Sequence, residues 1–383
     1  MRVFMSIPSG RGLALDGGSS GPFSAFPGAG FNYAWRDVPP PFMRAAWLCS
    51  LLLASACAGQ LAIEPGVSEP DGGHAPIDAA RPRADAGRAI EIADDGVVRV
   101  AVLSDLNGSY GPTTYGAPVR AAVERIIALE PDLVLSTGDM VAGQRAGLDY
   151  LAMWRAFHEA VSDPIARAAI PFAVTPGNHD ASGYSGYREE RAIFVDEWLA
   201  RPPEVELVDG AGYPLRYAFV IGPALFVSLD ATMVGPLDDE QVQWLDAILV
   251  ASDRPVKIVF GHVPLYPFAE GRETEHLGDG RLEELLVARG VDLFLSGHHH
   301  AFYPGRRGAL RLVSMACVGA GPRPLIGGDG EPSSRSIVLL EIDANGIRNL
   351  DGMTGSEYDA IVDRRELPEE VGLPELRIRR DDL

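Results

Sequence analysis

The sequence has 383 residues, of which 46% are hydrophobic and 22% are charged, and its formal net charge is −20. This composition is typical of a globular chain, and the length accommodates one large domain or two ordinary ones. The negative charge argues against binding to nucleic acid through a broad basic face. It is compatible with a small anionic substrate that is drawn to a local metal site.

The amino-terminal part has the pattern of an export signal preceded by an extension. Residues 1–42 are rich in Gly, Pro and Ser, and we interpret them as a non-native upstream extension. Residues 43–57, MRAAWLCSLLLASAC, combine an arginine, a short apolar stretch and small residues, as secretory signal peptides do. The final ASAC resembles a bacterial lipobox, which predicts lipidation of Cys57, and a signal that is simply cleaved is the alternative. Both interpretations predict an exported protein of the periplasm or cell envelope, and the lipid would attach it to a membrane.

The composition changes again after the signal. Residues 58–95 hold Pro, Gly and acidic residues with few large apolar ones, which predicts a flexible linker. Beyond it, short apolar runs alternate with helical periods, which predicts a layered α/β domain over 96–350. The charged C-terminal tail 351–383 has no pattern that places it. The expected strands are 97–104, 132–136, 170–175, 216–221, 224–229, 256–260, 291–295, 310–318 and 336–342. The expected helices are 116–130, 147–161, 188–200, 238–251 and 280–289.

Five of the expected strands are followed by side chains that can bind a metal or carry a proton. These groups are Asp105, Asp139, Asn178-His179-Asp180, His262 and His298-His299-His300. A glycine precedes four of the five, which lets the backbone turn sharply and approach a bound ion. Each group alone fits a turn, a helix cap or an ordinary histidine. Because functional residues of layered α/β proteins gather beyond the carboxyl ends of strands, the five groups together predict one metal site.

Taken in order, these groups resemble the motifs of the calcineurin-like metallophosphoesterase superfamily, which includes the purple acid phosphatases. The superfamily pattern is D-x-H, G-D, G-N-H-[DE], G-H and G-H-x-H. The chain has DLN at 105–107, GD at 138–139, GNHD at 177–180, GH at 261–262 and GHHH at 297–300. The resemblance covers about 97–318. It implies an α/β fold of four layers, a central β-sandwich flanked by α-helices, with a binuclear metal centre at one edge.

Carried over by position, the resemblance also implies a role for each group. Asp139 would bridge two ions, which the mixture of nitrogen and oxygen ligands predicts to be Mn, Fe or Zn. His179 would donate a proton to the leaving alkoxide, and Asp180 would orient its imidazole. The ligands of the first ion would be Asp105, Asn107 and His300, and those of the second would be Asn178, His262 and His298. His299, between two inward-pointing neighbours, is expected to point away.

Two positions depart from the superfamily pattern. Ala142 stands where purple acid phosphatases have a tyrosine that binds iron, so we expect no iron–tyrosinate centre. Asn107 stands in place of a histidine. If the strand continued through Asp105, both side chains would lie on one side of it, and the amide oxygen would face the first ion. The alternative is that Asn107-Gly108 is only a turn pair.

The leading hypothesis is a metal-dependent phosphoesterase that hydrolyses a small phosphomonoester or phosphodiester. A nuclease or a phosphodiesterase acting on nucleotides or cyclic nucleotides, from the same superfamily, is a second hypothesis, although the negative charge disfavours nucleic acid as a stable partner. A lipoprotein that keeps the fold as a non-catalytic binding module is a third. A binding module has no need of His179 as a proton donor beside the metal ligands, which disfavours this third hypothesis.

Overall fold

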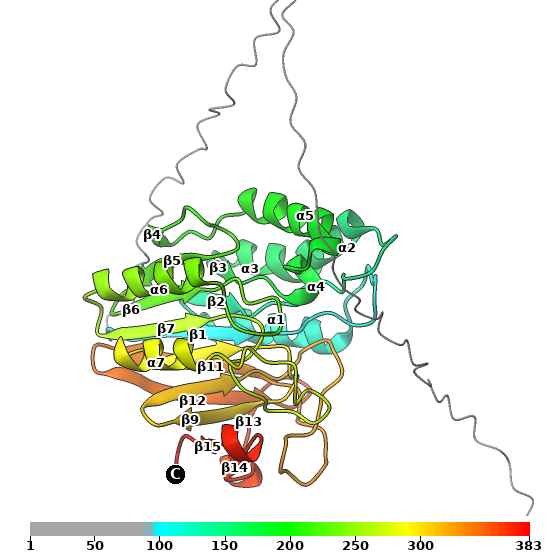
Figure 1. Cartoon of the computed structure of the whole chain (residues 1–383). Coiled ribbons are helices and arrows are strands. Elements are labelled where there is room, and N and C mark those ends of the chain that lie inside the picture. The colour runs from blue at the N-terminus through cyan, green and yellow to red at the C-terminus, as the bar shows by residue number, and fades with distance from the viewer. Residues whose placement is uncertain (1–89, 91–94) are drawn as a thin grey trace, which may run out of the picture. The chain divides into compact units, whose positions relative to one another are not determined.

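The computed structural model describes residue 90 and residues 95–383 of the chain (Figure 1). The features expected at 1–42, at 43–57 with Cys57, and at nearly all of 58–95 lie outside the described residues. Within the described part, no helix has both the length and the apolar character that crossing a membrane requires.

A six-stranded sheet carries the first strand-end groups. Its order is β13-β12-β11-β1-β2-β3, in which β1 is parallel to β2 and β2 to β3, whereas β11 runs antiparallel to β1. Its strands are β1 (Val98–Leu103), β2 (Leu133–Ser136), β3 (Phe172–Val174), β11 (Ile337–Asp343), β12 (Gly346–Thr354) and β13 (Ala360–Ile361). The sequence VRVAVL of β1 is buried along almost its whole length, as a strand covered on both faces requires.

A nine-stranded sheet carries the other groups. Its order is β14-β15-β9-β10-β8-β7-β6-β5-β4, and the run β6-β7-β8-β10 is parallel. Its strands are β4 (Glu206–Asp209), β5 (Tyr217–Ile221), β6 (Ala224–Ser228), β7 (Val256–Phe260), β8 (Leu293–Ser296), β9 (Tyr303–Arg307), β10 (Leu310–Ser314), β14 (Glu370–Val371) and β15 (Ile378–Arg380).

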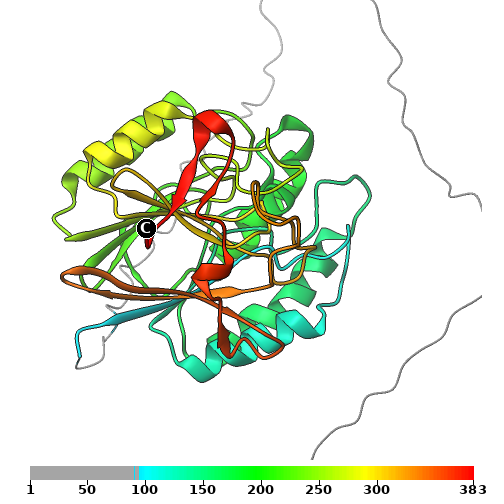
Figure 2. The ribbon, with the colours of Figure 1, turned by 90° about the horizontal axis from the view of Figure 1, so that it is seen from below.

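The helices cover the outer faces of both sheets. The apolar faces of α1, α2 and α5 pack on the six-stranded sheet, and those of α6 and α7 pack on the nine-stranded sheet. Figure 2 shows α7 and α1 on opposite sides, with the two sheets between them. The helices are α1 (Ala117–Leu129), α2 (Tyr150–Phe157), α3 (Asp163–Arg167), α4 (Asn178–Ala181), α5 (Arg188–Leu199), α6 (Asp239–Ala251) and α7 (Gly280–Ala288). The inner faces of the two sheets share one core that includes Val100, Leu135, Phe219 and Phe260.

This arrangement confirms the expected four layers, with helices outside a β-sandwich. All nine expected strands are present, although the one expected at 310–318 ends at Ser314. The helix expected at 147–161 is instead α2, followed by one π-helical segment, His158–Ser162, and then α3. The strands that the sequence analysis missed are β4, β9 and β12–β15.

The residues after 350 are part of both sheets. β12 extends through Thr354 and pairs with β13, while β15 pairs with β9 at the far side of the other sheet. Tyr303 adds a side-chain link, because its hydroxyl donates to the carbonyls of Pro368 and Glu369 at 3.0 Å each. Residues 351–383, which the sequence left unplaced, therefore extend the framework that holds the strand-end groups.

Candidate metal centre

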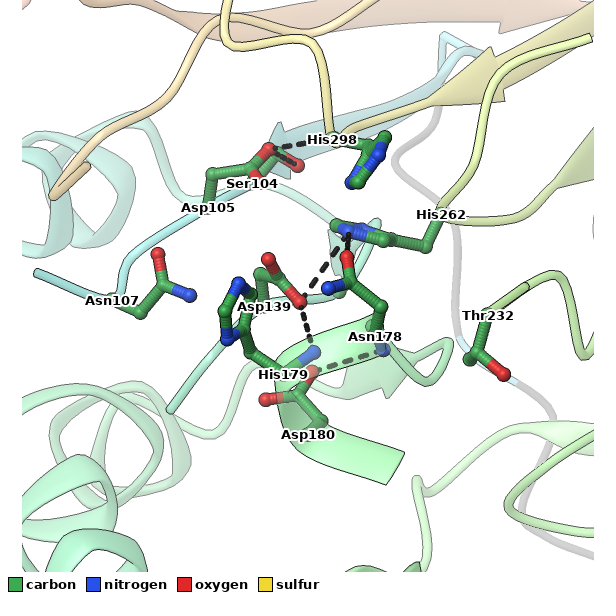
Figure 3. A network of polar contacts seen from close by, with 12 residues as sticks. Ser104, Asp105, Asn107, Asp139, Asn178, His179, Asp180, Thr232, His262 and His298 are labelled. Atoms are coloured by element: carbon green, nitrogen blue, oxygen red, sulfur yellow. Dashed lines mark hydrogen bonds and ion pairs between the residues drawn. The ribbon is translucent and has the colours of Figure 1, made fainter. Parts of the chain in front are cut away.

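The five strand-end groups meet at one edge of the sandwich (Figure 3). Asp105 follows β1, Asp139 follows β2, and His262 follows β7 in the other sheet. Each of these three residues is buried, and their potential ligand atoms all lie within 4.8 Å of one another. The carboxyl ends of parallel strands in both sheets thus converge on the same point, as the sequence pattern predicted.

His262 faces oxygen acceptors with both of its ring nitrogens. Its Nδ1 lies 2.9 Å from the carbonyl oxygen of Thr137, which assigns the N–H to Nδ1. Its Nε2 lies 2.9 Å from Oδ1 of Asn178 and 3.3 Å from Oδ1 of Asp139. The Asn178 amide is oriented by its Nδ2, which donates to Oε1 of Gln144 at 3.0 Å. A cation, either a proton or a metal ion, is therefore required on Nε2.

The pKa values of His262 and Asp139 also indicate a cation between the two side chains. Burial by itself would lower the pKa of His262, but the carboxylate of Asp139 outweighs it and raises that pKa to about 9. Burial by itself would raise the pKa of Asp139, and the imidazole of His262 holds it below its ordinary value. Without a metal, the pair holds a proton between buried groups.

Asp105 and His300 form the second half of the centre. Oδ2 of Asp105 accepts from the hydroxyl of Ser104 at 2.6 Å and from the backbone N–H of His298 at 3.2 Å. Oδ1 of Asp105 is buried and accepts no hydrogen bond from the described residues, although Nε2 of His300 lies 3.1 Å away. The Nδ1 of His300 faces the carbonyl of Gly321 at 2.9 Å. The Asp105 oxygen and the His300 nitrogen thus offer two further ligand atoms to a cation.

These contacts fit a metal site. Within the described part of the chain, Oδ1 of Asp105 is buried without a hydrogen-bond donor, and two imidazoles donate from Nδ1 while turning Nε2 toward oxygen atoms. Imidazoles whose other nitrogen is fixed by a carbonyl are the usual form of histidine ligands. Imidazole nitrogen, carboxylate oxygen and amide oxygen together suit Mn, Fe or Zn.

His298 is held by a residue that the sequence analysis missed. Its Nε2 lies 3.0 Å from Oε2 of Glu275, which also forms an ion pair with Arg272. The hydrogen bond from His298 lowers the pKa of Glu275 to about 2, so the carboxyl stays ionised. Because Nε2 is occupied in this way, Nδ1 is the nitrogen of His298 that remains for a metal. Glu275 lies in the loop between β7 and α7, where no strand-end pattern pointed to it.

His299 turns away from the centre, as expected. The backbone N–H of Phe268 donates to its Nδ1 at 3.0 Å, and its Nε2 lies 2.9 Å from the carbonyl of Glu275. Both ring nitrogens are thus used to tie two loop segments together, and burial lowers the pKa of His299 to about 3.

The backbone at the centre adopts a conformation that is rare for residues other than glycine. Asp105, Asp139, His298 and His300 have φ angles of 51°, 56°, 66° and 56°. Such left-handed conformations are unfavourable for non-glycine residues and cluster at functional sites. They also correct one expectation, because the chain is not an extended strand at Asp105. β1 ends at Leu103, so strand alternation does not position Asn107.

Asn107 lies beside Asp105 and Asp139 (Figure 3). Its side chain is buried, and its Nδ2 donates to the carbonyl of Val141 at 3.3 Å. Its backbone N–H donates to the carbonyl of Asp139 at 3.1 Å. The amide thus bridges to the segment after β2 instead of closing a turn on its own backbone, which disfavours the turn-pair interpretation.

His179 and Asp180, the expected proton donor and its orienting acid, diverge in the structure. The Nδ1 of His179 lies 3.0 Å from the carbonyl of Gly143, and its ring stands 5.3 Å from that of Tyr110, between centroids. Asp180 does not orient this imidazole. Its carboxylate accepts from the N–H groups of Val141 at 2.9 Å and Gly177 at 3.0 Å. Burial, followed by repulsion from Asp139, raises the pKa of Asp180 to about 8.

A cavity of about 230 Å³ opens onto the centre. Its lining includes Asn107, Tyr110, Asp139, His179, His298 and His300, together with Arg272 and Arg323. A larger hollow of about 390 Å³ lies beside Trp198 and Pro202, but the converging ligands are at the smaller one. The two arginines were not anticipated from the sequence, because they lie in loops without a period or motif.

A family model described as calcineurin-like phosphoesterase matches residues 98–302, which is more than half of the chain. The chain belongs to this family. The matched segment contains every strand-end group of the centre, so the resemblance stated from the five motifs is confirmed.

The similar proteins include purple acid phosphatases. The chain is 32% identical to purple acid phosphatase 18 of Arabidopsis thaliana over 180 residues, which cover 44% of this chain and 38% of that protein. It is 26% identical to tartrate-resistant acid phosphatase type 5 of Sus scrofa over 205 residues, 48% of this chain and 57% of that protein. The chain thus spans less than two thirds of the length of these relatives.

A solved structure supports the fold. The purple acid phosphatase PPD1 of yellow lupin (Lupinus luteus) superimposes with a TM-score of 0.54 at 19% identity. The superposition covers 72% of this chain and 54% of that one. At this identity the likeness establishes the shared metallophosphoesterase fold.

Proposed function

We propose that this protein is a metal-dependent phosphoesterase that hydrolyses phosphomonoesters or phosphodiesters. The observation that carries the proposal is the convergence of Asp105, Asp139 and His262 within 4.8 Å, beside a cavity that Asp139 and His179 line. A metal site of this donor type, beside an imidazole that can donate a proton, suits ester hydrolysis. The names of the two curated relatives, both acid phosphatases, agree with it.

The proposed centre would hold two ions on the residues already described. Asp139 would be shared by both ions, since its carboxylate lies within 4.8 Å of ligand atoms of Asp105 and His262. Asp105, His300 and Asn107 would hold one ion, and Asn178, His262 and His298 would hold the other. When bound, the ions would neutralise phosphate charge and lower the pKa of a water molecule to supply a hydroxide nucleophile. Ala142 lines the same cavity and offers no phenolate, so no iron–tyrosinate colour is expected.

His179 is the proposed general acid. Its Nδ1 is fixed by the carbonyl of Gly143, and its backbone N–H donates to Oδ1 of Asp139 at 2.9 Å. Both contacts hold the residue at the cavity and leave Nε2 to protonate the leaving alkoxide. Asp180 acts indirectly. Its carboxylate accepts hydrogen bonds from two backbone N–H groups and so joins the loop after β2 to the start of α4. It is therefore a positioning residue.

The test uses esters whose leaving groups differ in basicity. After loading with Mn, Fe or Zn, the protein should hydrolyse p-nitrophenyl, phenyl and alkyl phosphates. His179→Asn should lower kcat about 10²-fold or more for the alkyl ester and far less for the p-nitrophenyl ester, which needs little protonation. Its metal content should match that of the wild type.

The matched control is His276→Asn, since His276 lies outside the lining of the cavity. It should leave both rates unchanged. Failure of the wild type to hydrolyse any monoester or diester with any of the three metals would overturn the proposal. An equal loss in His179→Asn for all esters would remove His179 as the general acid while leaving the phosphoesterase intact.

Export and membrane attachment belong to the same proposal. The signal pattern at 43–57 predicts a protein of the cell envelope that is anchored through a lipid on Cys57. Expressed with its signal, the wild type should partition with membranes and Cys57→Ser should be released. Equal partitioning of the two proteins would contradict the lipid anchor.

A further inference from the structure

Arg323 lies at the wall of the metal-centre cavity and forms no ion pair with any residue that the structure describes. Among the described residues, no hydrogen bond or ion pair involves its guanidinium, and its Nε is buried without a partner. A desolvated donor without an acceptor is costly, since burial removes the water that would otherwise satisfy it. Its neighbour at the cavity, Arg272, is by contrast paired with Glu275.

The backbone of Arg323 is tied directly to the centre. Its N–H donates to the carbonyl of His300 at 3.3 Å, and its carbonyl accepts from the N–H of Ser333 at 2.9 Å. The next residue, Pro324, accepts from the N–H of Glu270 at 2.9 Å. The backbone of Arg323 is therefore held beside a proposed metal ligand, and its side chain lines the cavity.

The charge balance makes this position unusual. The chain carries 53 acidic and 33 basic residues, and two of the acidic residues, Asp105 and Asp139, are proposed ligands at the centre. Against this background, two arginines share one cavity of about 230 Å³. Each repels the other, and the pKa of Arg323 is lowered by burial first and by Arg272 next. An anion between them would relieve both the repulsion and the lack of an acceptor.

From this arrangement we infer that Arg323, with Arg272, forms an anion subsite beside the metal centre. The subsite would select phosphoesters whose alcohol part carries a second anionic oxygen group, phosphate or carboxylate. This inference rests on the proposed function, because one phosphate would occupy the metal centre while the second group occupies the subsite. The planar fork of a guanidinium matches both groups through paired hydrogen bonds.

Arg323 is the residue to vary. Arg272 pairs with Glu275, which holds His298, so its replacement would disturb a proposed metal ligand. Arg323→Gln removes the charge without breaking an ion pair. Arg323→Lys keeps the charge and loses the fork. The matched control is Arg306→Gln, an exposed arginine of β9 that lines no part of this cavity.

The experiment compares three esters that share a propyl phosphate and differ at its far end, which is a hydroxyl, a carboxylate or a second phosphate. The wild type should favour the two anionic esters through a lower KM. In Arg323→Gln, the preference in kcat/KM should fall about 10-fold or more, as expected for a charge-assisted hydrogen bond. The preference of Arg323→Lys should lie between those of the wild type and Arg323→Gln, and the preference of Arg306→Gln should match that of the wild type. The carboxylate and phosphate arms show which group the subsite favours.

Binding gives a readout that does not depend on turnover. Calorimetry of the metal-loaded protein should show tighter binding of propane-1,3-diphosphonate than of propylphosphonate, with the difference reduced about 10-fold in Arg323→Gln. If no ester is hydrolysed, the proposed function fails, and the ratio of the two phosphonate affinities alone tests whether the subsite exists. No preference in the wild type, or an equal loss for all ligands in Arg323→Gln, would overturn the subsite.

Discussion

Nε2 of His300 lies 3.1 Å from Oδ1 of Asp105, while its Nδ1 faces the carbonyl oxygen of Gly321. A neutral imidazole that donates from Nδ1 presents a lone pair to the carboxylate, so the contact requires a cation. The attraction of Asp105 raises the pKa of His300 even though burial acts against it. The same arrangement recurs between His262 and Asp139, so the centre contains two such contacts.

Metal removal should destabilise the folded protein. A metal that binds the folded chain and not the unfolded one adds about 2.7 kcal/mol to the free energy of unfolding when its concentration is 100 times Kd. Urea unfolding after treatment with a chelator should therefore show a lower midpoint, which added Mn or Zn restores. The midpoint of Asp139→Asn should respond far less to the chelator. Superimposable wild-type curves with and without metal would contradict the metal site.

Replacement of Asn107 should tune the affinity of the proposed first ion. Asn107→His restores an imidazole and should bind metal more tightly. Asn107→Leu removes the amide oxygen and should weaken binding about 10-fold, as loss of a supporting polar group commonly does. Competition with a coloured chelator measures both variants. Unchanged affinity in both would mean that the amide serves only its hydrogen bond to Val141.

Gly177 should be intolerant of a side chain. A Cβ at this position would collide with the backbone N–H and the carboxylate of Asp139. Because backbone cannot move aside as a flexible side chain can, Gly177→Ala should cost about 3 kcal/mol in free energy of unfolding and abolish metal binding. Gly186→Ala is the control, since a Cβ there meets no atom of the described residues within 4 Å. Equal stability of the two variants would contradict this close approach.

His158 should make stability depend on pH. It is buried in the π-helical segment, bonded to Ser162 Oγ at 2.6 Å and to Glu197 Oε2 at 3.2 Å. Burial first, and Arg201 next, lower its pKa from 6.5 to about 4. Between these values the unfolded chain binds a proton that the folded chain does not. This contribution to stability is complete above pH 6.5 and is lost as the pH falls toward 4.

Because of His158, the free energy of unfolding should fall by about 2 kcal/mol between pH 7 and pH 5. Urea unfolding of the wild type and of His158→Gln at both pH values measures it. The difference between their free energies of unfolding should shrink by this amount at pH 5. A difference that stays constant would show that His158 keeps its ordinary pKa in the folded protein.

The order of the proposed ligands was predictable because each of them follows an apolar strand within a few residues. That local pattern sufficed for Asp105, Asp139 and His262, since parallel strands end at a common edge. Glu275 and Arg323 could not be found in this way. They lie in loops, and only the contacts of those loops with the segment 298–300 bring them to the centre.

Other errors have equally local causes. Asp180 was assigned to the imidazole of His179 because the two are adjacent in sequence. At the start of α4, however, successive side chains point about 100° apart. β9, with the sequence YPGRR, contains the proline and glycine that indicate a turn, and its pairing with β10 overrides them. The π-helical segment joins α2 to α3 without a change in apolar spacing.

The central claim is a bridging role for Asp139 between two catalytic metal ions. Elemental analysis of the purified protein, together with hydrolysis of p-nitrophenyl phosphate and bis(p-nitrophenyl) phosphate, tests it most directly. The wild type should hold two ions per chain, and Asp139→Asn should lose metal and about 10³-fold in kcat. Asp253→Asn, an exposed acid outside the cavity, should change neither. Full metal content and undiminished hydrolysis in Asp139→Asn would contradict the account.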